Sequence, residues 1–164
     1  LFQDTGRPAM HGSGALLVTP DGRYLLQHRD LNPRIWFPGY WGLFGGGAER
    51  GESAESALWR ELAEELEMAP RAAHFFCQVL FDVGDPRGYV YGRSLFVVPI
   101  EASEAEGLPL HEGQGMRLFS PEDVRREPRI VPYDLFGLEM HWHRDSWRHV
   151  LPPEPWAGRP DRSD

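Results

Sequence analysis

The sequence predicts an α/β layered domain, and two observations support that prediction. Short apolar segments of strand length occur along the chain together with two longer helical segments, and such mixtures fold as helices packed on a sheet. Hydrophobic residues make up 41% of the 164 residues, which argues against disorder and is enough for one core. We expect a single domain over residues 12–150. Residues 1–11 are expected to form an irregular arm, with Met10 as a candidate native start, and residues 151–164 a loose tail.

Six strands are expected, most of them bounded by turn residues or glycine. They cover residues 15–18, 24–29, 41–44, 73–83, 89–100 and 115–119. The first two form a hairpin, because Pro20-Asp21-Gly22 between them is a turn sequence. Cys77 is the only cysteine and lies among apolar residues of the fourth strand, where we expect it to be buried.

The first main helix is expected over residues 54–67. Ser53 is a favoured N-cap residue, and the Ala, Leu and Glu residues that follow are strong helix formers. Leu58, Leu62 and Leu66 would form an apolar stripe that faces a core. Pro70 lies beyond the last of them and ends the helix.

The C-terminal third is expected to begin with an acidic connection over residues 101–107. Ser120 followed by Pro121 indicates the capped start of a short helix. The second main helix is expected over residues 132–150. Three histidines are interpreted as ordinary surface residues of this helix rather than zinc ligands, because their spacing does not bring them to face one another. They are His141, His143 and His149.

Glycine and charged residues between Gly46 and Glu65 keep one unbroken register. The pattern is G-x5-E-x7-R-E-L-x-E-E, and with average residue usage a chance match in a chain of this length is about a one-in-a-million event. Gly45, Gly46 and Gly47 permit backbone conformations and a close approach to a ligand that side chains forbid. The segment therefore predicts a ligand-binding loop that leads into the first helix.

Three glutamates share one side of this helix. At about 3.6 residues per turn, Glu65 and Glu64 lie about 40° and about 60° to either side of Glu61. Such carboxylates repel one another, whereas Mg²⁺ and Mn²⁺ prefer oxygen ligands and reverse the sign of that cost. The alternative is a solvated charged stripe, which the glycine loop and Arg60 in the same register disfavour.

This register resembles the Nudix box, G-x5-E-x7-R-E-U-x-E-E-x-G-U, in which U is apolar. The resemblance runs from Gly46 through Glu65, and Met68 fits the last apolar position. Glu67 stands where the family usually has glycine, and Phe44 where many members have proline. The resemblance is to MutT-like Nudix hydrolases, and it implies a Nudix-type α/β/α sandwich around a mixed β-sheet.

The resemblance also implies a reaction, the metal-dependent hydrolysis of a nucleoside diphosphate linked to another group, X. Glu61, Glu64 and Glu65 would bind Mg²⁺ or Mn²⁺ with help from the backbone carbonyl of Gly45, and Arg60 would orient them. The products would be a nucleoside monophosphate and phospho-X. The alternative is a non-catalytic nucleotide-binding regulatory module on the same fold. Loss of a metal-binding glutamate would indicate that alternative, and none is lost.

Residues outside the box complete the predicted site. Glu112 lies in a loop that resembles the Glu-Gly-Gln segment of MutT-type proteins, and it is either an exposed loop acid or a further metal ligand or base on a flexible loop. Glu64, Glu65 and Glu112 are the candidate general bases. An arginine and aromatic rings before the box could bind phosphate and stack on a base, or simply pack that loop. The substrate-binding candidates are Arg29, Trp36 and Tyr40.

The charge of the chain limits its partners. A net charge of −8 leaves no basic footprint for nucleic acid, which argues against an RNA-processing relative, and a phosphate substrate would need cations to offset repulsion. The expected substrate is a small nucleotide or nucleotide sugar: a nucleoside triphosphate, oxidised or ordinary, ADP-ribose or a dinucleoside polyphosphate. Many relatives are dimers, so a homodimer is a candidate assembly. No apolar run approaches the roughly 20 residues of a membrane span, and a cytoplasmic location is expected.

Overall fold

A computed structural model describes residues 9–82, 84 and 86–147 of the chain. The strands are β1 (Ala9–Val18), β2 (Tyr24–His28), β3 (Trp41–Gly42), β4 (His74–Phe81), β5 (Val90–Pro99) and β6 (Gly115–Phe119). The helices are α1 (Ala54–Leu66), α2 (Ala102–Gly107), α3 (Pro121–Arg126), α4 (Pro132–Trp142) and α5 (Arg144–Trp147). The six strands form one sheet, which confirms the predicted α/β class.

The sheet is mixed. Its order is β3-β2-β1-β5-β4, with β6 paired to β2 off this path. The strands β1 and β5 run parallel, from Ala9 opposite Val90 to Val18 opposite Pro99, and the other pairs are antiparallel. Strand β2 pairs with β1 at Val18 opposite Tyr24, and further along β1 the glycine loop takes over, with Phe44 bridged to Ala15 and Gly47 bridged to Gly12.

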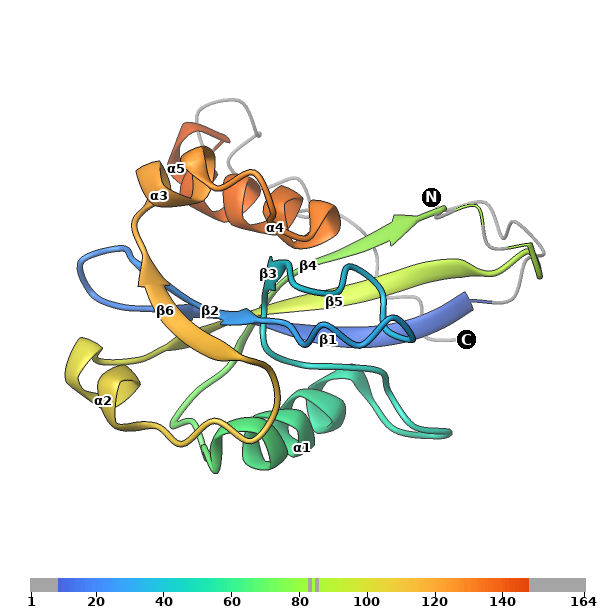
Figure 1. The fold of residues 1–164 in the computed structure, drawn as a ribbon, viewed down its shortest axis with the longest axis horizontal. Coiled ribbons are helices and arrows are strands. Elements are labelled where there is room, and N and C mark those ends of the chain that lie inside the picture. The colour runs from blue at the N-terminus through green and yellow to red at the C-terminus, as the bar shows by residue number, and fades with distance from the viewer. Residues whose placement is uncertain (1–8, 83, 85, 148–164) are drawn as a thin grey trace, which may run out of the picture.

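Helices cover both faces of the sheet, with α1 and α2 on one side and α3, α4 and α5 on the other (Figure 1). Successive residues of a strand point to opposite faces, and the two cores divide accordingly. Leu17 and Leu25 pack in the core of α1, whereas their neighbours Leu16 and Leu26 pack in the core of α4. The predicted three-layer arrangement follows from this division.

Helix α1 begins and ends close to the predicted positions. The Ser53 hydroxyl accepts a hydrogen bond of 3.0 Å from the Ser56 N–H, and the leucine stripe of the helix is fully buried. Glu67 follows the last helical residue with φ 50° and ψ 29°, and its N–H donates to the Ala63 carbonyl. A non-glycine residue therefore closes this helix in the left-handed conformation that usually favours glycine.

Several predicted boundaries were wrong. Strand β1 begins at Ala9 rather than at residue 15, so residues 9–11 of the predicted arm belong to the sheet. Gly12 and Gly14 lie within this strand and hide its apolar pattern. The predicted acidic connection is the helix α2, which buries Ala105. Residues 148–164, including His149 and the predicted tail, lie outside the described residues.

The predicted second main helix is interrupted. Helix α4 ends at Trp142, and His143 separates it from the short α5. His143 is exposed as predicted, but His141 was wrongly placed on the surface. Its side chain is buried, and its ring lies 3.0 Å from the Tyr24 hydroxyl. Burial lowers the pKa of His141 to about 4.

Candidate active site

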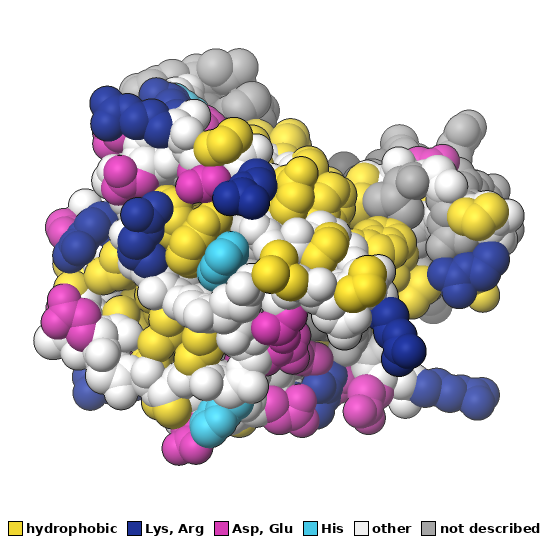
Figure 2. Space-filling model, in the orientation of Figure 1, with side chains coloured by type: hydrophobic (Ala, Val, Ile, Leu, Met, Phe, Trp, Pro, Cys, Tyr) yellow, Lys and Arg dark blue, Asp and Glu magenta, His cyan; other side chains and the backbone are white. Residues whose placement is uncertain are grey.

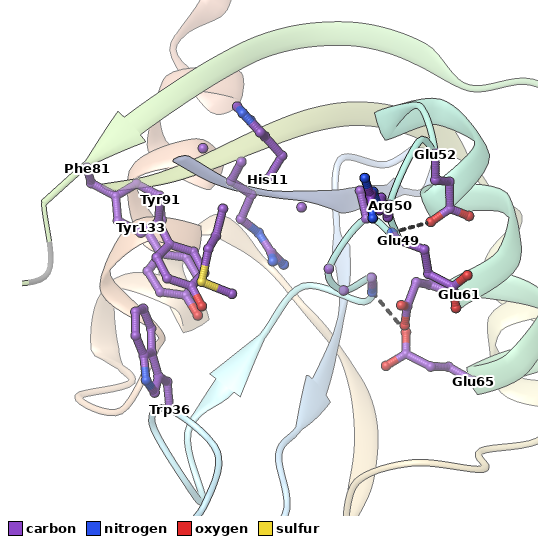
Figure 3. Close-up of a pocket in the computed structure, with 18 of the residues that line it drawn as sticks. His11, Trp36, Glu49, Arg50, Glu52, Glu61, Glu65, Phe81, Tyr91 and Tyr133 are labelled. Carbon is purple, nitrogen blue, oxygen red and sulfur yellow. Dashed lines mark hydrogen bonds between the residues drawn. The ribbon is translucent and has the colours of Figure 1, made fainter. Parts of the chain in front are cut away.

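A cavity of about 920 Å³ opens beside the glycine loop and has two chemically different ends. Carboxylates from α1 and from the segment before it lie at one end, and aromatic rings lie at the other, with His11 between them (Figure 3). Figure 2 shows acidic side chains gathered below a band of hydrophobic ones on this face of the molecule. The carboxylate-end residues that line the cavity are Glu49, Glu52, Glu61, Glu65 and Glu112.

The glycine loop is pressed between β1 and α1. The Ser13 N–H donates to the Gly46 carbonyl at 2.9 Å. A Cβ atom on Gly45, which has φ 113°, would lie 2.6 Å from the Ser13 carbonyl oxygen. A Cβ atom on Gly46 would lie 2.6 Å from the Glu61 carboxylate. Gly45 requires glycine, because its φ is positive and a side chain there would push the loop off the strand. A side chain at Gly46 would instead displace the Glu61 carboxylate from its place beside the loop.

Arg60 ties the charged residues of the box together. Its guanidinium donates to Glu52 at 3.1 Å, to Glu61 at 2.8 Å and to Glu64 at 3.3 Å. It also donates to the Gly47 carbonyl at 3.0 Å, which fixes the loop to the helix. The hydrogen bonds from Arg60 hold the pKa of Glu52 below its usual range. These contacts suit the predicted orienting role of Arg60, which stays a prediction.

Glu65 is the most deeply buried carboxylate of the site, with 5% of its surface exposed. Two neutral donors hold it, the Gly45 N–H at 2.8 Å and the Gln27 amide at 3.1 Å. Burial raises the pKa of Glu65 to about 7, and the nearby charges of Glu112 and Glu61 add to that shift. Glu65 is therefore a carboxylate whose charge is poorly compensated by the protein itself.

Glu112 lies on a turn whose two flanking residues are hydrogen-bonded to the rest of the protein. The His111 N–H donates to the Glu65 carbonyl at 2.9 Å, and the Gln114 N–H donates to the His28 carbonyl at 2.7 Å. Gly113 has φ 88°, and a Cβ there would lie 2.8 Å from the His28 carbonyl oxygen. The turn is therefore bonded at both ends and lies directly on β2, and its flexibility stays a prediction.

The predicted metal ligands are only partly brought together. Glu61 and Glu65 line the cavity with Gly45 and Glu112, whereas the Glu64 side chain is 62% exposed and pairs with Arg60. Within residues 9–82, 84 and 86–147, no three His, Cys, Asp or Glu side chains are already grouped so as to hold a metal ion. The cavity-facing carboxylates nevertheless fit a hard divalent cation, because they are oxygen donors with excess negative charge.

The predicted substrate residues divide in the same way. Arg29 and Trp36 line the cavity, and the Arg29 Nε donates to the Trp36 carbonyl at 3.2 Å. Tyr40 is absent from the residues that line the cavity, because its ring packs edge-on against Phe37, 5.4 Å between centroids. Tyr40 therefore lies outside this cavity, and its contact with a substrate stays a prediction.

Sequence reasoning missed most of the aromatic end. Phe81 and Tyr133 stack with centroids 4.8 Å apart, and Trp36 lies 4.3 Å from Tyr91. The signal was present in part, since Tyr91 and Arg93 are two residues apart on a predicted strand and so point to the same face. Nothing in the sequence showed which face meets the cavity.

Arg93 lines the cavity beside these rings and is anchored from behind. Its Nε lies 2.9 Å from Asp134 Oδ1 in a close ion pair, although the N–H is not aimed at that oxygen. The other oxygen of Asp134 accepts a 3.0 Å hydrogen bond from the Leu43 N–H. The guanidinium carbon lies 5.4 Å from the centre of the Tyr133 ring. The aromatic end is thus also a cationic end.

Comparison with known proteins identifies the family to which this fold and site belong. A model of the NUDIX domain matches residues 10–135, which is most of the chain. The protein therefore belongs to the NUDIX family, and the predicted resemblance is confirmed. Within the described residues, no helix is both long enough and apolar enough to cross a membrane.

Relatives and solved structures agree with that membership. The nucleoside triphosphatase NudI of Escherichia coli O139:H28 (strain E24377A / ETEC) is 52% identical over 50 residues, which are 30% of this chain and only 35% of NudI. The MutT protein from Methanosarcina mazei Go1 is 22% identical with a TM-score of 0.70, over 85% of this chain and 96% of that one. The MutT NUDIX hydrolase from Burkholderia pseudomallei is 26% identical with a TM-score of 0.65, over 80% and 96%.

Proposed function

We propose that this protein hydrolyses a nucleoside diphosphate linked to another group, X, in a reaction that depends on Mg²⁺ or Mn²⁺. The observation that supports this most is the single cavity whose two ends carry opposite chemistry. Carboxylates at one end suit cations on a pyrophosphate, and aromatic rings with arginines at the other suit a nucleoside. The proposed products are a nucleoside monophosphate and phospho-X, or pyrophosphate where X is phosphate.

At the carboxylate end, Glu61, Glu65 and Glu112 would hold the cation with the carbonyl of Gly45, and Glu64 would join them by turning from its exposed position. A bound divalent cation supplies charge neutralisation on the pyrophosphate oxygens. Arg60 keeps the glutamates oriented through its bonds to three carboxylates.

The attacking water needs a base and an open path to phosphorus. Glu64, Glu65 and Glu112 are the candidate bases, and Glu65 and Glu112 are favoured because both line the cavity. A bound cation would favour the ionised form of Glu65, which is the form that can accept a proton. The bond that breaks is the bridging P–O bond of the pyrophosphate, and the leaving group departs as a phosphate ester or as pyrophosphate.

At the other end, the rings of Trp36 and Tyr91 offer faces and edges on which a base can stack. Arg29, Arg34 and Arg93 line the same cavity and would offset the charge of phosphates entering a protein with a net charge of −8. A triphosphate leads the substrate candidates, because the similar NudI is a nucleoside triphosphatase. We also propose the cytoplasm as its compartment, since nucleotides are concentrated there, and a homodimer as its assembly.

A substrate panel tests this function. Nucleoside triphosphates, nucleotide sugars, ADP-ribose and dinucleoside polyphosphates are incubated with Mg²⁺ or Mn²⁺, and products are separated by chromatography. We expect a nucleoside monophosphate from at least one compound and none after exhaustive chelation. Binding without turnover across the panel would instead support the regulatory alternative. Undiminished turnover in the chelated sample would overturn the metal-dependent mechanism.

A further inference from the structure

Gln27 is a buried amide in contact with two parts of the candidate active site that are far apart in sequence. We propose that it is a positioning residue that couples Glu65 to the turn carrying Glu112. This inference rests on the proposed function for its effect on catalysis. Its structural part, the coupling itself, can be measured without any turnover.

The geometry centres on one nitrogen atom. The Gln27 Nε2 donates to Glu65 Oε1 and to the backbone carbonyl of Glu112, at 3.1 Å in each case. Only 2% of Gln27 is exposed, so neither bond competes with bulk water. The neutral amide supplies two N–H groups, one for each acceptor, without bringing a positive charge into the carboxylate end.

The backbone of Gln27 is fixed on both sides. It pairs with Gly42 of β3 on one edge and with Met116 of β6 on the other. The Glu112 turn lies against its side chain, because a Cβ on Gly113 would come within 2.9 Å of the Gln27 Cγ. Gln27 is thus a rigid support on which the turn rests, and its amide has little freedom to find other partners.

A residue that only filled the core at position 27 would not need to be glutamine. Burying an amide carries a desolvation cost that an apolar side chain of the same length avoids. The two acceptors, in contrast, belong to a carboxylate of α1 and to the turn that presents a second carboxylate. Those carboxylates repel each other, and a donor bonded to the carboxylate of Glu65 and to the backbone of Glu112 keeps both in place. We therefore assign Gln27 to the preorganisation of the site rather than to the stability of the core.

The primary test is Gln27→Met, which keeps the length of the side chain and removes both donors. Amide hydrogen exchange of His111 and Gln114 reports on the turn, and calorimetry with Mn²⁺ alone reports on the carboxylates. We expect faster exchange at both amides and Mn²⁺ affinity reduced about 10-fold, the lower end for outer-shell partners of metal ligands. The control is Gln78→Met, which removes an amide of β4 that is bonded to Ser94 of β5, outside the cavity. If Gln27→Met had the same amide exchange rates and the same Mn²⁺ affinity as wild type, the proposed coupling would be overturned.

A double-mutant cycle with Glu112→Gln separates positioning from simple loss of structure. We expect Gln27→Met to lower kcat about 10-fold with KM nearly unchanged, and Glu112→Gln to cost less in that background than in wild type. Additive effects would overturn the proposal. If wild type itself neither binds Mn²⁺ nor hydrolyses any substrate, the proposed function fails while the exchange result still decides the coupling. If Gln27→Met does not fold, Gln27→Asn replaces it, because it keeps a neutral amide but is one methylene too short to reach both acceptors, with the same expected losses.

Discussion

The two ends of the cavity are built by different means. The carboxylate end consists mainly of one contiguous segment, in which Arg60, the glycine loop and α1 hold each other through short hydrogen bonds and ion pairs. The aromatic end brings together Trp36, Phe81, Tyr91 and Tyr133 from four segments, largely through ring contacts. Directional bonds fix atoms to within a fraction of an ångström, whereas ring packing fixes a shape. The first suits chemistry and the second suits recognition of a substrate.

The largest expected effect lies at the carboxylate end. We predict that Glu65→Gln lowers kcat roughly 10²–10³-fold, since the change removes charge but little volume from a preorganised electrostatic site. Steady-state kinetics at saturating Mg²⁺ would measure it, with circular dichroism to confirm the fold. Glu64→Gln is expected to lower kcat by a large factor as well. A Glu64→Gln protein as active as wild type would restrict the cation site to the carboxylates that face the cavity here.

Substitution of Glu112 tests whether the carboxylate end extends beyond the segment of the Nudix box. We predict that Glu112→Gln lowers kcat roughly 10–100-fold while raising KM less, because the lost interaction matters mainly in the transition state. The separate determination of kcat and KM at saturating Mg²⁺ distinguishes the two. A kcat equal to that of wild type would make Glu112 an ordinary loop acid and leave the carboxylate end entirely within one segment.

Substitutions at the aromatic end should change KM rather than kcat. We predict that Trp36→Ala raises KM about 5–150-fold with kcat nearly unchanged, since stacking of a base on an aromatic ring contributes about 1–3 kcal/mol. Phe37→Ala is a control from the same loop, because the Phe37 ring contacts Tyr40 and Tyr133 but the residue does not line the cavity. A large fall in kcat for Trp36→Ala would contradict the division of labour between the two ends.

The same difference explains what the sequence could predict. Helix α1 and the glycine loop follow from local features, such as the Ser53 cap and the spacing of Leu58, Leu62 and Leu66. The meeting of Phe81 with Tyr91 depends instead on the register between β4 and β5. That register arises from long-range pairing, which a single sequence does not fix.

Two corrections have the same physical origin. The first residues of β1 contain Gly12 and Gly14, and pairing with the parallel β5 makes this segment a strand despite its weak pattern. His141 looked like a surface residue on its own helix, but the Tyr24 hydroxyl, 117 positions away in the chain, provides a buried partner. The contact between Tyr40 and Phe37, in contrast, is local to one loop.

The smallest expected effect concerns stability at the far end of α1. Glu67 adopts φ 50°, and left-handed backbone costs a non-glycine residue about 1–2 kcal/mol. Glycine removes that strain but adds entropy to the unfolded chain, and the exposed Glu67–His111 pair that would be lost contributes little. We predict that Glu67→Gly stabilises the protein by roughly 0.5–1 kcal/mol.

Thermal unfolding would detect this gain as a rise in Tm of about 1–4 °C. Glu67→Ala is the matched control, because it removes the carboxylate and its pair with His111 but keeps a Cβ at a strained position. Glu67→Gly should therefore be more stable than both wild type and Glu67→Ala. Equal stability of the two variants would show that the helix end carries no strain. Helix α1, which carries the glutamates of the carboxylate end, would then be unstrained at its C-terminus. Having glutamate there in place of the usual glycine would have no energetic consequence.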